Sequence, residues 1–248
     1  MRKSLEWLSQ LLVSILIWLF VALITTIVTT LIILVRPFDP NQKIGHKIAN
    51  LWGMAIVRAN PLWRIKITGR SHIKKNKGYV LVSNHRSLAD IVCLFCLGKE
   101  FKWIAKAGLF KVPLLGWAMS LLNYIALARG KHGSIKDTVE IARTYLKSDV
   151  SVLFFPEGTR SRNKELAPFK NGAFKLAIET QKPIVPIVIS GTEQALEKGK
   201  IMMAAHVQGF VKVLPEIDTS GYRPDQFEAL KERVWNLMNE ELGKRQGV

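Results

Sequence analysis

The sequence predicts an α/β domain with a mixed, mostly parallel sheet flanked by helices, preceded by an N-terminal membrane-associated helical segment. One observation behind this is that short β-branched runs alternate with helical stretches along most of the 248 residues. The other is that no residue between Trp7 and Val35 carries a formal charge. We therefore divide the chain into a membrane anchor over residues 1–58 and a globular domain over residues 59–248.

The anchor begins with a long apolar helix. The stretch from Leu11 to Val35 would be roughly 37 Å long as a helix, enough for a hydrocarbon layer of roughly 30 Å. A cleaved signal peptide is disfavoured, because the apolar run is too long and no A-x-A-like site follows Val35. We expect the segment to stay attached.

After Pro37 and Pro40, an amphipathic helix is predicted up to residue 58. Its apolar face is formed by Ile44, Ile48, Leu51, Trp52 and Ala55, and its polar face by Lys43, His46, Lys47 and Asn50. Basic residues flank the apolar helix on both sides, so the positive-inside rule gives little guidance. A hairpin in the cytoplasmic leaflet and a single span stay equally open, with two soluble core helices as a third alternative.

The charge balance points to a polyanionic partner. The chain has 36 Lys and Arg against 19 Asp and Glu, a net charge of +17. The segment from Arg58 to Gly78 holds seven basic residues and no acid, which favours anionic lipid headgroups, with a solvated loop face as the alternative. Trp63 is the only aromatic residue in that segment, so base-stacking platforms for nucleic acid are missing.

The globular domain divides into alternating strands and helices. Predicted strands cover Trp63 to Ile67, Tyr79 to Val82, Lys102 to Ala105, Tyr124 to Leu127, Val150 to Phe155, Ile184 to Ile189 and Val207 to Val213. Predicted helices cover Leu88 to Leu97, Ile135 to Leu146, Gly172 to Glu179 and Asp225 to Leu242. The only cysteines, Cys93 and Cys96, fall in the first of these helices and are expected to pack in the core rather than bind metal.

Chemistry in such sheets gathers where strands end and helices begin. The segment YVLVSNHRSLAD delivers His85 at the end of one strand, and SVLFFPEGTR delivers Glu157, Gly158, Thr159 and Arg160 at the end of another. Pro156 stops that second strand, and Gly158 permits a tight backbone turn.

His85 and Asp90 could meet only if the histidine lies in the turn and the aspartate in the first helical turn. Ser87 followed by Asp90 supports this placement, because S-x-x-D is a variant of the capping box. The carboxylate would then fix the imidazole tautomer and leave the other ring nitrogen to accept a proton from a hydroxyl. The alternative is that Asp90 only caps the helix and His85 lies on the surface.

The hydroxyl to be activated is expected to belong to a substrate. No G-x-S-x-G occurs, and neither cysteine lies in a turn, so no protein nucleophile is at hand. A dyad without its own nucleophile indicates direct transfer of an acyl group. The Gly-rich phosphate loops G-x-x-x-x-G-K and G-x-G-x-x-G are also missing, which argues against nucleotide hydrolysis and dinucleotide chemistry.

Five motifs closely resemble those of the glycerolipid acyltransferases, specifically the 1-acylglycerol-3-phosphate acyltransferases of bacterial phospholipid synthesis. They are NHRSLAD at 84–90, KAGLFKVPLLGWAMSLLNYIALAR at 106–129, FPEGTR at 155–160, FKNGAFKLA at 169–177 and VPIVISGTE at 185–193. The resemblance runs from about Ala59 to Leu214. Departures are confined to the second motif, where Gly108 and Ala128 replace residues that are often acidic in the family.

The resemblance implies transfer of a fatty acyl chain from acyl-CoA or acyl carrier protein to the 2-hydroxyl of lysophosphatidic acid, giving phosphatidic acid. By the same resemblance His85 is the general base, oriented by Asp90. The phosphate-binding residues implied are Arg160, Lys106 and Arg129, and the turn of Glu157, Gly158 and Thr159 contacts the glycerol. A planar guanidinium also suits bidentate phosphate binding on general grounds.

These readings imply no metal, no tightly held cofactor and no nucleic-acid partner, with the catalytic domain on the cytoplasmic side of the cell inner membrane. Backbone amides near Ser87 or Val112 are candidates for stabilising the oxyanion. Acylation of glycerol 3-phosphate or another lysolipid remains an alternative acceptor reaction. A non-catalytic protein that binds anionic lipid is the alternative from another class.

Overall fold

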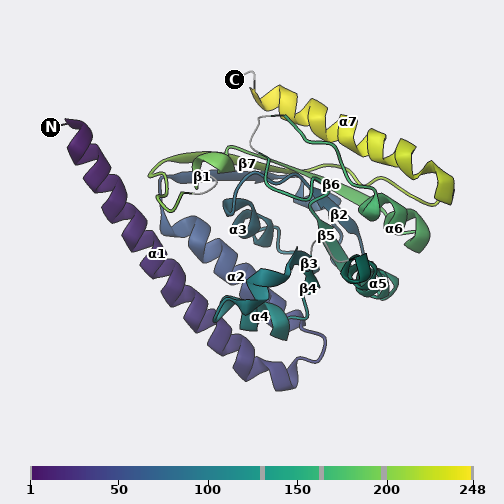
Figure 1. Cartoon of the computed structure of the whole chain (residues 1–248), viewed down its shortest axis with the longest axis horizontal. Helices are drawn as coiled ribbons and strands as arrows, with labels where there is room; N and C mark the ends of the chain where they lie inside the picture. Colours follow the sequence, from purple (N-terminus) through teal and green to yellow (C-terminus); the bar gives the residue numbers. More distant parts are fainter. Residues whose placement is uncertain (1, 129–131, 162–164, 197–199, 247–248) are drawn as a thin grey trace.

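A seven-stranded sheet forms the centre of the molecule in the computed structural model, which describes residues 2–128, 132–161, 165–196 and 200–246 (Figure 1). Its strands are β1 (Trp63–Thr68), β2 (Val80–Ser83), β3 (Phe101–Lys106), β4 (Ile125–Leu127), β5 (Ser151–Phe154), β6 (Ile184–Ser190) and β7 (Val207–Val213). Every predicted strand is present, and both ends of each strand lie within one residue of their predicted positions.

The strand order is β1-β7-β6-β2-β5-β3-β4. The five strands from β6 to β4 run parallel to one another, whereas β7 pairs antiparallel with β6 and parallel with β1. The prediction of a mixed, mostly parallel sheet is therefore confirmed. Because the five parallel strands point the same way, the segments that follow β2, β5 and β6 meet at one edge of the sheet.

Helices cover both faces of the sheet (Figure 1). They are α1 (Arg2–Val35), α2 (Lys43–Ala59), α3 (Ala89–Phe95), α4 (Leu115–Leu121), α5 (His132–Lys147), α6 (Gly172–Thr180) and α7 (Phe227–Gln246). Side chains alternate along β2, so that Val80 and Val82 pack with α5, α6 and α7 while Leu81 packs with α2, α3 and α4. Both faces of β2 are thus buried, as its continuous apolar run predicts.

The helices differ from expectation at four places, the first being α5, which begins at His132, three residues before the predicted start. A short 3₁₀ turn at Pro224–Gln226 precedes α7, which then continues to Gln246, beyond the predicted end. The predicted Leu88 to Leu97 helix is shorter, because α3 begins at Ala89 and ends at Phe95. Helix α4 was not predicted: its sequence LGWAMSL is apolar nearly throughout and lacks the polar face that marks an amphipathic helix.

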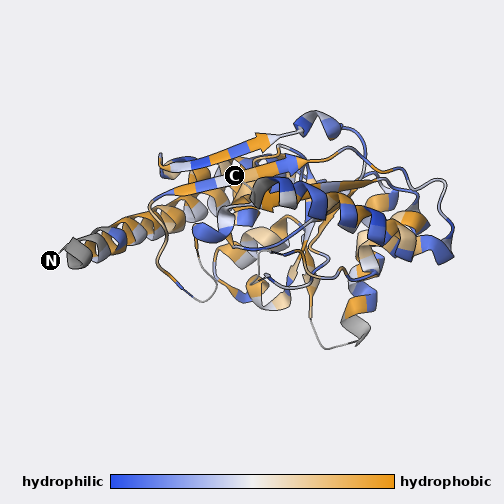
Figure 2. Ribbon diagram, turned by 90° about the horizontal axis from the view of Figure 1, so that it is seen from above, coloured by the Kyte–Doolittle hydropathy of each residue, from blue (hydrophilic) through white to orange (hydrophobic). Residues whose placement is uncertain are grey.

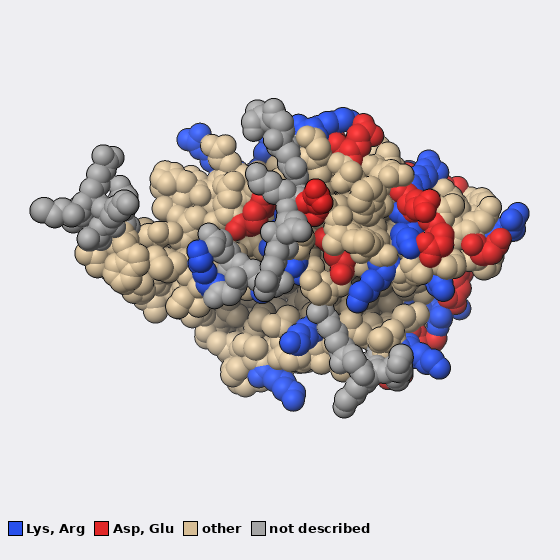
Figure 3. Space-filling model, turned by 45° about the horizontal axis from the view of Figure 1, so that its top comes forward, with Lys and Arg blue, Asp and Glu red and all other residues tan. Residues whose placement is uncertain are grey.

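The N-terminal helix lies along the domain instead of projecting away from it. The Trp18 indole donates a hydrogen bond to the Ile201 carbonyl at 2.7 Å, and the Thr29 hydroxyl contacts the Leu114 carbonyl at 3.4 Å. Among the described residues, Gln10–Phe38 is the one stretch long and apolar enough to cross a membrane. Figure 2 shows the mostly apolar character of α1 beyond its grey N-terminal end, and the tan part of α1 visible in Figure 3 carries no charged side chain.

Candidate active site

His85 lies directly after β2, in the turn that leads to α3. Its ring stacks on Phe155 from the end of β5, with 4.1 Å between the ring centroids and 18° between the planes. The two residues meet because β2 and β5 are parallel neighbours whose carboxyl ends coincide. The side chain of His85 is 15% exposed, so the ring is held by the protein yet open on one edge.

Asp90 joins this turn through both of its carboxylate oxygens. Oδ2 accepts hydrogen bonds from His85 Nδ1 at 2.8 Å, from the Arg86 amide at 2.7 Å and from the Ser87 amide at 2.9 Å. Oδ1 accepts a hydrogen bond from the Thr192 hydroxyl at 2.5 Å. The expected meeting of His85 and Asp90 is present, and the backward bond from Asp90 to Ser87 is the one that a capping box makes.

This arrangement fixes the tautomer of His85. An ionised carboxylate only accepts hydrogen bonds, so the shared proton belongs to Nδ1, and Nε2 keeps a lone pair. Within the described part of the chain, no hydrogen bond to Nε2 is found. The ring can therefore accept a proton from a substrate hydroxyl placed at its open edge.

Thr192 is a site residue that the sequence analysis missed. It is fully buried in the 3₁₀ turn Thr192–Gln194 that follows β6, and it comes from the VPIVISGTE motif. The motif was noticed, but no role could be given to the threonine because the order of β6 and β2 in the sheet was unknown. Asn84 adds to this link: its amide group exchanges two hydrogen bonds with the backbone of Ile189, each 2.8 Å long.

The turn after β5 closes the other side of the histidine. Glu157 Oε1 accepts a hydrogen bond from the His85 amide at 2.9 Å, and Oε2 accepts one from the Ala167 amide at 3.2 Å. Burial raises the pKa of Glu157 above its usual value, against the opposing effect of these two amides. The Glu157 carboxylate thus fixes the loop in place, and its side chain faces protein backbone.

Gly158 has the backbone conformation that the sequence analysis expected. Its φ is +74°, in the left-handed region, and a Cβ at this position would lie 2.9 Å from the Nζ of Lys170. A glycine here lets an ammonium approach the backbone of the turn. Thr159 is exposed, and Arg160 is half-buried at the same edge of the sheet.

The other two expected phosphate ligands are placed less fully. Lys106 is exposed at the carboxyl end of β3, two strands away from β2 in the sheet. Arg129 lies outside the described residues. The structure therefore brings His85, Asp90, Glu157 and Gly158 into one contiguous group, with Arg160 beside them and Lys106 further along the same edge.

Backbone amides near Ser87 or Val112 were expected as candidates for stabilising the oxyanion. The Ser87 amide itself donates to Asp90, and the Val112 amide donates to the Leu109 carbonyl at 3.1 Å. These two amides are therefore used by the turns that shape the site, and the neighbouring amides stay a prediction.

An apolar cavity of about 480 Å³ opens beside α3, within one turn of Asp90. Its walls come from four helices and include Val28 of α1, Trp52 of α2, Val92 of α3 and Ala118 of α4. Such a cavity suits a chain of methylene groups, because burying each one contributes about 0.8 kcal/mol. The sequence analysis gave no sign of it, since its lining is spread over segments far apart in the chain.

Comparisons with known proteins point to one family. Residues 64–190 match the family model described as Acyltransferase. A chloroplastic 1-acyl-sn-glycerol-3-phosphate acyltransferase of Arabidopsis thaliana is 39% identical over 190 residues, which cover 76% of this chain and 52% of that protein. A 1-acyl-sn-glycerol-3-phosphate acyltransferase of Limnanthes douglasii is 34% identical, over 84% of this chain and 74% of that protein.

The chain spans about half the length of the first of these curated relatives. Among solved structures, the crystal structure of the 1-acyl-sn-glycerophosphate (LPA) acyltransferase from Thermotoga maritima is similar, with a TM-score of 0.81. It is 23% identical, and the match covers 96% of this chain and 98% of that one. At that identity the likeness concerns the fold alone.

Proposed function

The chain belongs to the acyltransferase family, and from that premise we propose that it moves a fatty acyl chain from an acyl thioester to the 2-hydroxyl of 1-acylglycerol 3-phosphate, giving phosphatidic acid. The observation that carries the proposal is the contact between His85 and Asp90, which leaves Nε2 as a base at an open edge of the site. The product would be a precursor for membrane phospholipids.

The chemistry follows from that geometry. Nε2 of His85 takes the proton of the acceptor hydroxyl. At the same time the hydroxyl oxygen forms a bond to the carbonyl carbon of the thioester. The tetrahedral intermediate then expels the thiolate as the C–S bond breaks, and the imidazolium returns the proton to sulfur. Asp90 stabilises the imidazolium between these two steps.

Positively charged side chains along the same edge are suited to the acceptor phosphate. Arg160 lies directly beyond the Gly158 turn, and its fork of donors matches two phosphate oxygens. Lys106 would contribute a longer-range attraction from β3, and Arg129, which lies outside the described residues, stays a prediction from the resemblance. The turn of Glu157, Gly158 and Thr159 would lie against the glycerol.

The apolar cavity is proposed to hold an acyl chain. Its wall includes Leu88 and Ala89, which lie between His85 and Asp90 in the chain, so an acyl chain lying in it would carry a carbonyl or a glycerol towards Nε2. Both acyl-CoA and acyl carrier protein remain candidate donors, and they differ in the group attached to the sulfur. Parallel assays with the two thioesters would identify the donor.

The N-terminal helices are proposed to hold the protein in one leaflet of the membrane, with the domain on the cytoplasmic face of the inner membrane. Trp18 and Thr29 both bond to loops of the domain, at points roughly 16 Å apart along α1. A helix fastened at two such points cannot cross the bilayer without drawing those loops into it. The hairpin is therefore favoured over the single span.

The decisive experiment measures thiol release by the purified full chain with lysophosphatidic acid and an acyl thioester. His85→Ala should lower the rate by about 10²–10⁴-fold, because general-base assistance is lost. His206→Ala is the matched control, since His206 is exposed and, among the described residues, makes no hydrogen bond to the His85 turn, and it should keep the wild-type rate.

Normal turnover by His85→Ala would refute the role of the histidine. A wild-type protein that never releases thiol with any acceptor would instead favour a lipid-binding protein without catalysis. Faster release with glycerol 3-phosphate than with lysophosphatidic acid would change the acceptor and leave the mechanism intact.

A further inference from the structure

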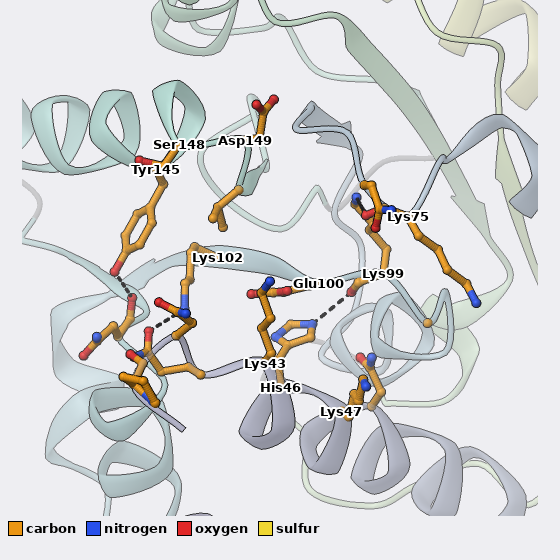
Figure 4. Close-up of a pocket in the computed structure, with 18 of the residues that line it drawn as sticks. Lys43, His46, Lys47, Lys75, Lys99, Glu100, Lys102, Tyr145, Ser148 and Asp149 are labelled. Carbon is orange, nitrogen blue, oxygen red and sulfur yellow. Dashed lines mark hydrogen bonds between the residues drawn. The ribbon is translucent and has the colours of Figure 1, made fainter. Parts of the chain in front are cut away.

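A second cavity, with a volume of about 920 Å³, lies at the opposite edge of the sheet from His85 (Figure 4). It lies where β3 and β5 begin, and residues 40–42 of the α1–α2 connection form part of its wall. Five lysines line it: Lys43 and Lys47 from α2, Lys75 from the segment before β2, and Lys99 and Lys102 at the start of β3.

Lys102 is buried, with only 2% of its surface exposed. Its ammonium donates hydrogen bonds to Gln42 Oε1 at 3.1 Å and to the Leu122 carbonyl at 2.8 Å, and it lies 5.2 Å from the centroid of the Tyr145 ring. None of these partners carries a negative charge. Burial lowers the pKa of Lys102 to about 8, against the opposing effect of the nearby carboxylates of Glu100 and Asp39.

Lys99 is held in a similar way. Its ammonium donates to the carbonyls of Lys74, Lys75 and Lys77 at 2.7–2.9 Å, and burial lowers its pKa to about 8. The loop before β2 therefore wraps around this cation. That wrapping places Lys75 at the rim of the cavity, on the side facing α2.

The cavity contains few negative charges to balance these lysines. Of its two acidic residues, Asp149 already forms an ion pair with Lys182 at 2.6 Å. Among the described residues, Glu100 has no ion pair within 4 Å. His46 also lines the wall, but burial lowers its pKa to about 3, so it is neutral. Five lysines thus line a hollow whose wall has two acidic residues, one of them already paired with Lys182.

The position of the cavity suggests the source of an anion. The apolar stretch Gln10–Phe38 ends just before the residues that line it. Leu34 and Phe38 at that end are 63% and 82% exposed, so an apolar tip stands beside the basic hollow. A lipid whose hydrocarbon met this tip would have its headgroup at the level of Lys43 and Lys47.

We propose that this basic cavity binds a phosphate group, presented by the headgroup of an anionic membrane lipid or by a free phosphate monoester. The site is separate from the edge that carries His85 and Arg160, and the proposal does not rest on acyl transfer. Its five lysines come from three segments that the fold brings together, and a phosphate would add negative charge to a cavity in which lysines outnumber acidic residues.

The test compares two charge-matched variants of the full chain. Lys47→Gln with Lys75→Gln removes two exposed lysines from the cavity rim, and Lys136→Gln with Lys175→Gln removes two exposed lysines elsewhere, on α5 and α6. Both pairs are made in an Arg160→Ala background, so that phosphate at the proposed acceptor site does not contribute. Equal melting temperatures would show that both variants fold.

Two probes distinguish the sources. One is flotation with phosphatidylcholine vesicles that contain phosphatidic acid, and the other is calorimetric titration with inorganic phosphate. The cavity variant should bind about thirtyfold more weakly than the control, from roughly fivefold for each lysine near a phosphate. A loss confined to the vesicles identifies a lipid headgroup, and a loss confined to the titration identifies a free phosphate monoester.

Equal binding by the two variants in both assays would overturn the proposal. Repeating the comparison with Lys43→Gln in place of Lys47→Gln measures the loss of binding with a second pair of lysines from the same rim. Because no acyl transfer is measured, failure here would leave the proposed enzymatic function untouched. Loss of thiol release in His85→Ala would likewise say nothing about this cavity.

Discussion

The Thr192 hydroxyl links the loop after β6 to the carboxylate that orients His85. Asp90 is fully buried, so every hydrogen bond to its oxygens offsets part of the cost of removing a charge from water. Thr192 supplies the only bond to Oδ1 that is found in the described residues, while the other three bonds go to Oδ2. Its loss should therefore affect the dyad without touching a substrate.

We expect Thr192→Val to lower kcat by about 10- to 100-fold while the KM for the acceptor stays unchanged, because the carboxylate loses its fixed position. Thr192→Ser keeps the hydroxyl and should restore most of the rate. Steady-state kinetics on the three proteins would check this. A valine variant with wild-type kcat, or a serine variant as slow as the valine one, would contradict the positioning role.

His46 provides a test of electrostatics away from the active site. Nε2 contacts the Lys99 carbonyl at 2.9 Å, which can only accept, so Nε2 carries the proton and Nδ1 accepts from the Tyr124 hydroxyl. Burial lowers the pKa of His46 to about 3 in the folded chain, against 6.5 for the unfolded one. Between these values the unfolded state binds more protons, so stability falls as the pH is lowered.

We expect the free energy of unfolding to drop by about 1.5 kcal/mol from this group between pH 6.5 and pH 5. His46→Gln should lose that part of the pH dependence, whatever its stability at neutral pH. Exposed His206→Gln is the control and should keep the wild-type slope. Urea unfolding at several pH values measures both, and an unchanged slope in His46→Gln would contradict the assignment.

Among the elements, α2 approaches α3 closely because a glycine faces it. A Cβ on Gly53 would lie 2.5 Å from the Cβ of Phe95 and 2.8 Å from the Val92 carbonyl. That separation is too short for two packed atoms. The contact joins the predicted anchor to the helix that carries Asp90.

Gly53→Ala should therefore destabilise the protein by about 1–3 kcal/mol, the usual cost of overpacking. Gly243→Ala in α7 is the matched control, since nothing lies within 4 Å of its added Cβ. That change should stabilise the protein by about 0.5–1 kcal/mol through helix propensity. Thermal melts decide the matter, and an unchanged melting temperature in Gly53→Ala would show that α2 can shift freely.

Local sequence signals predicted the positions of most strands and helices well. They did not predict which of these elements lie next to one another in the fold. Each strand is a β-branched run bounded by turn residues, so its position could be read directly. The turn at His85 could also be predicted, because Ser87 and Asp90 are close in sequence. Thr192 lies 102 residues from Asp90, and only the sheet order brings them together. The lysines of the basic cavity were missed for the same reason.

For the molecule as a whole, the exposed side of α1 is a continuous apolar stripe. Its members recur every three or four residues and are Leu12, Leu16, Leu19, Leu23, Ile27, Leu31 and Leu34. Each of them is at least 43% exposed, whereas Ile17, Val28 and Ile32 on the other side are buried against the domain. The helix thus presents one apolar face to the protein and another to its surroundings, which fits a helix lying in a leaflet.

Replacing Leu16, Leu19 and Leu23 by Gln should weaken binding to phosphatidylcholine vesicles by more than about 100-fold. The reason is that each leucine contributes about 1.5–3 kcal/mol when it is fully buried in hydrocarbon. Flotation of uncharged vesicles isolates this effect from the lysines. Leu237→Gln on α7, which changes an exposed leucine on the opposite layer, should bind like the wild type. Equal flotation of the triple variant would argue against insertion of α1.

The apolar cavity draws its wall from α1 and α2 as much as from the domain they precede. Trimming the chain to obtain a water-soluble enzyme would consequently remove more than a tether. It would remove one wall of the cavity that is proposed to hold an acyl chain, and it would expose Phe95 and the residues around it to solvent. The N-terminal helices and the domain therefore form one structural unit, because both contribute to the wall of the apolar cavity.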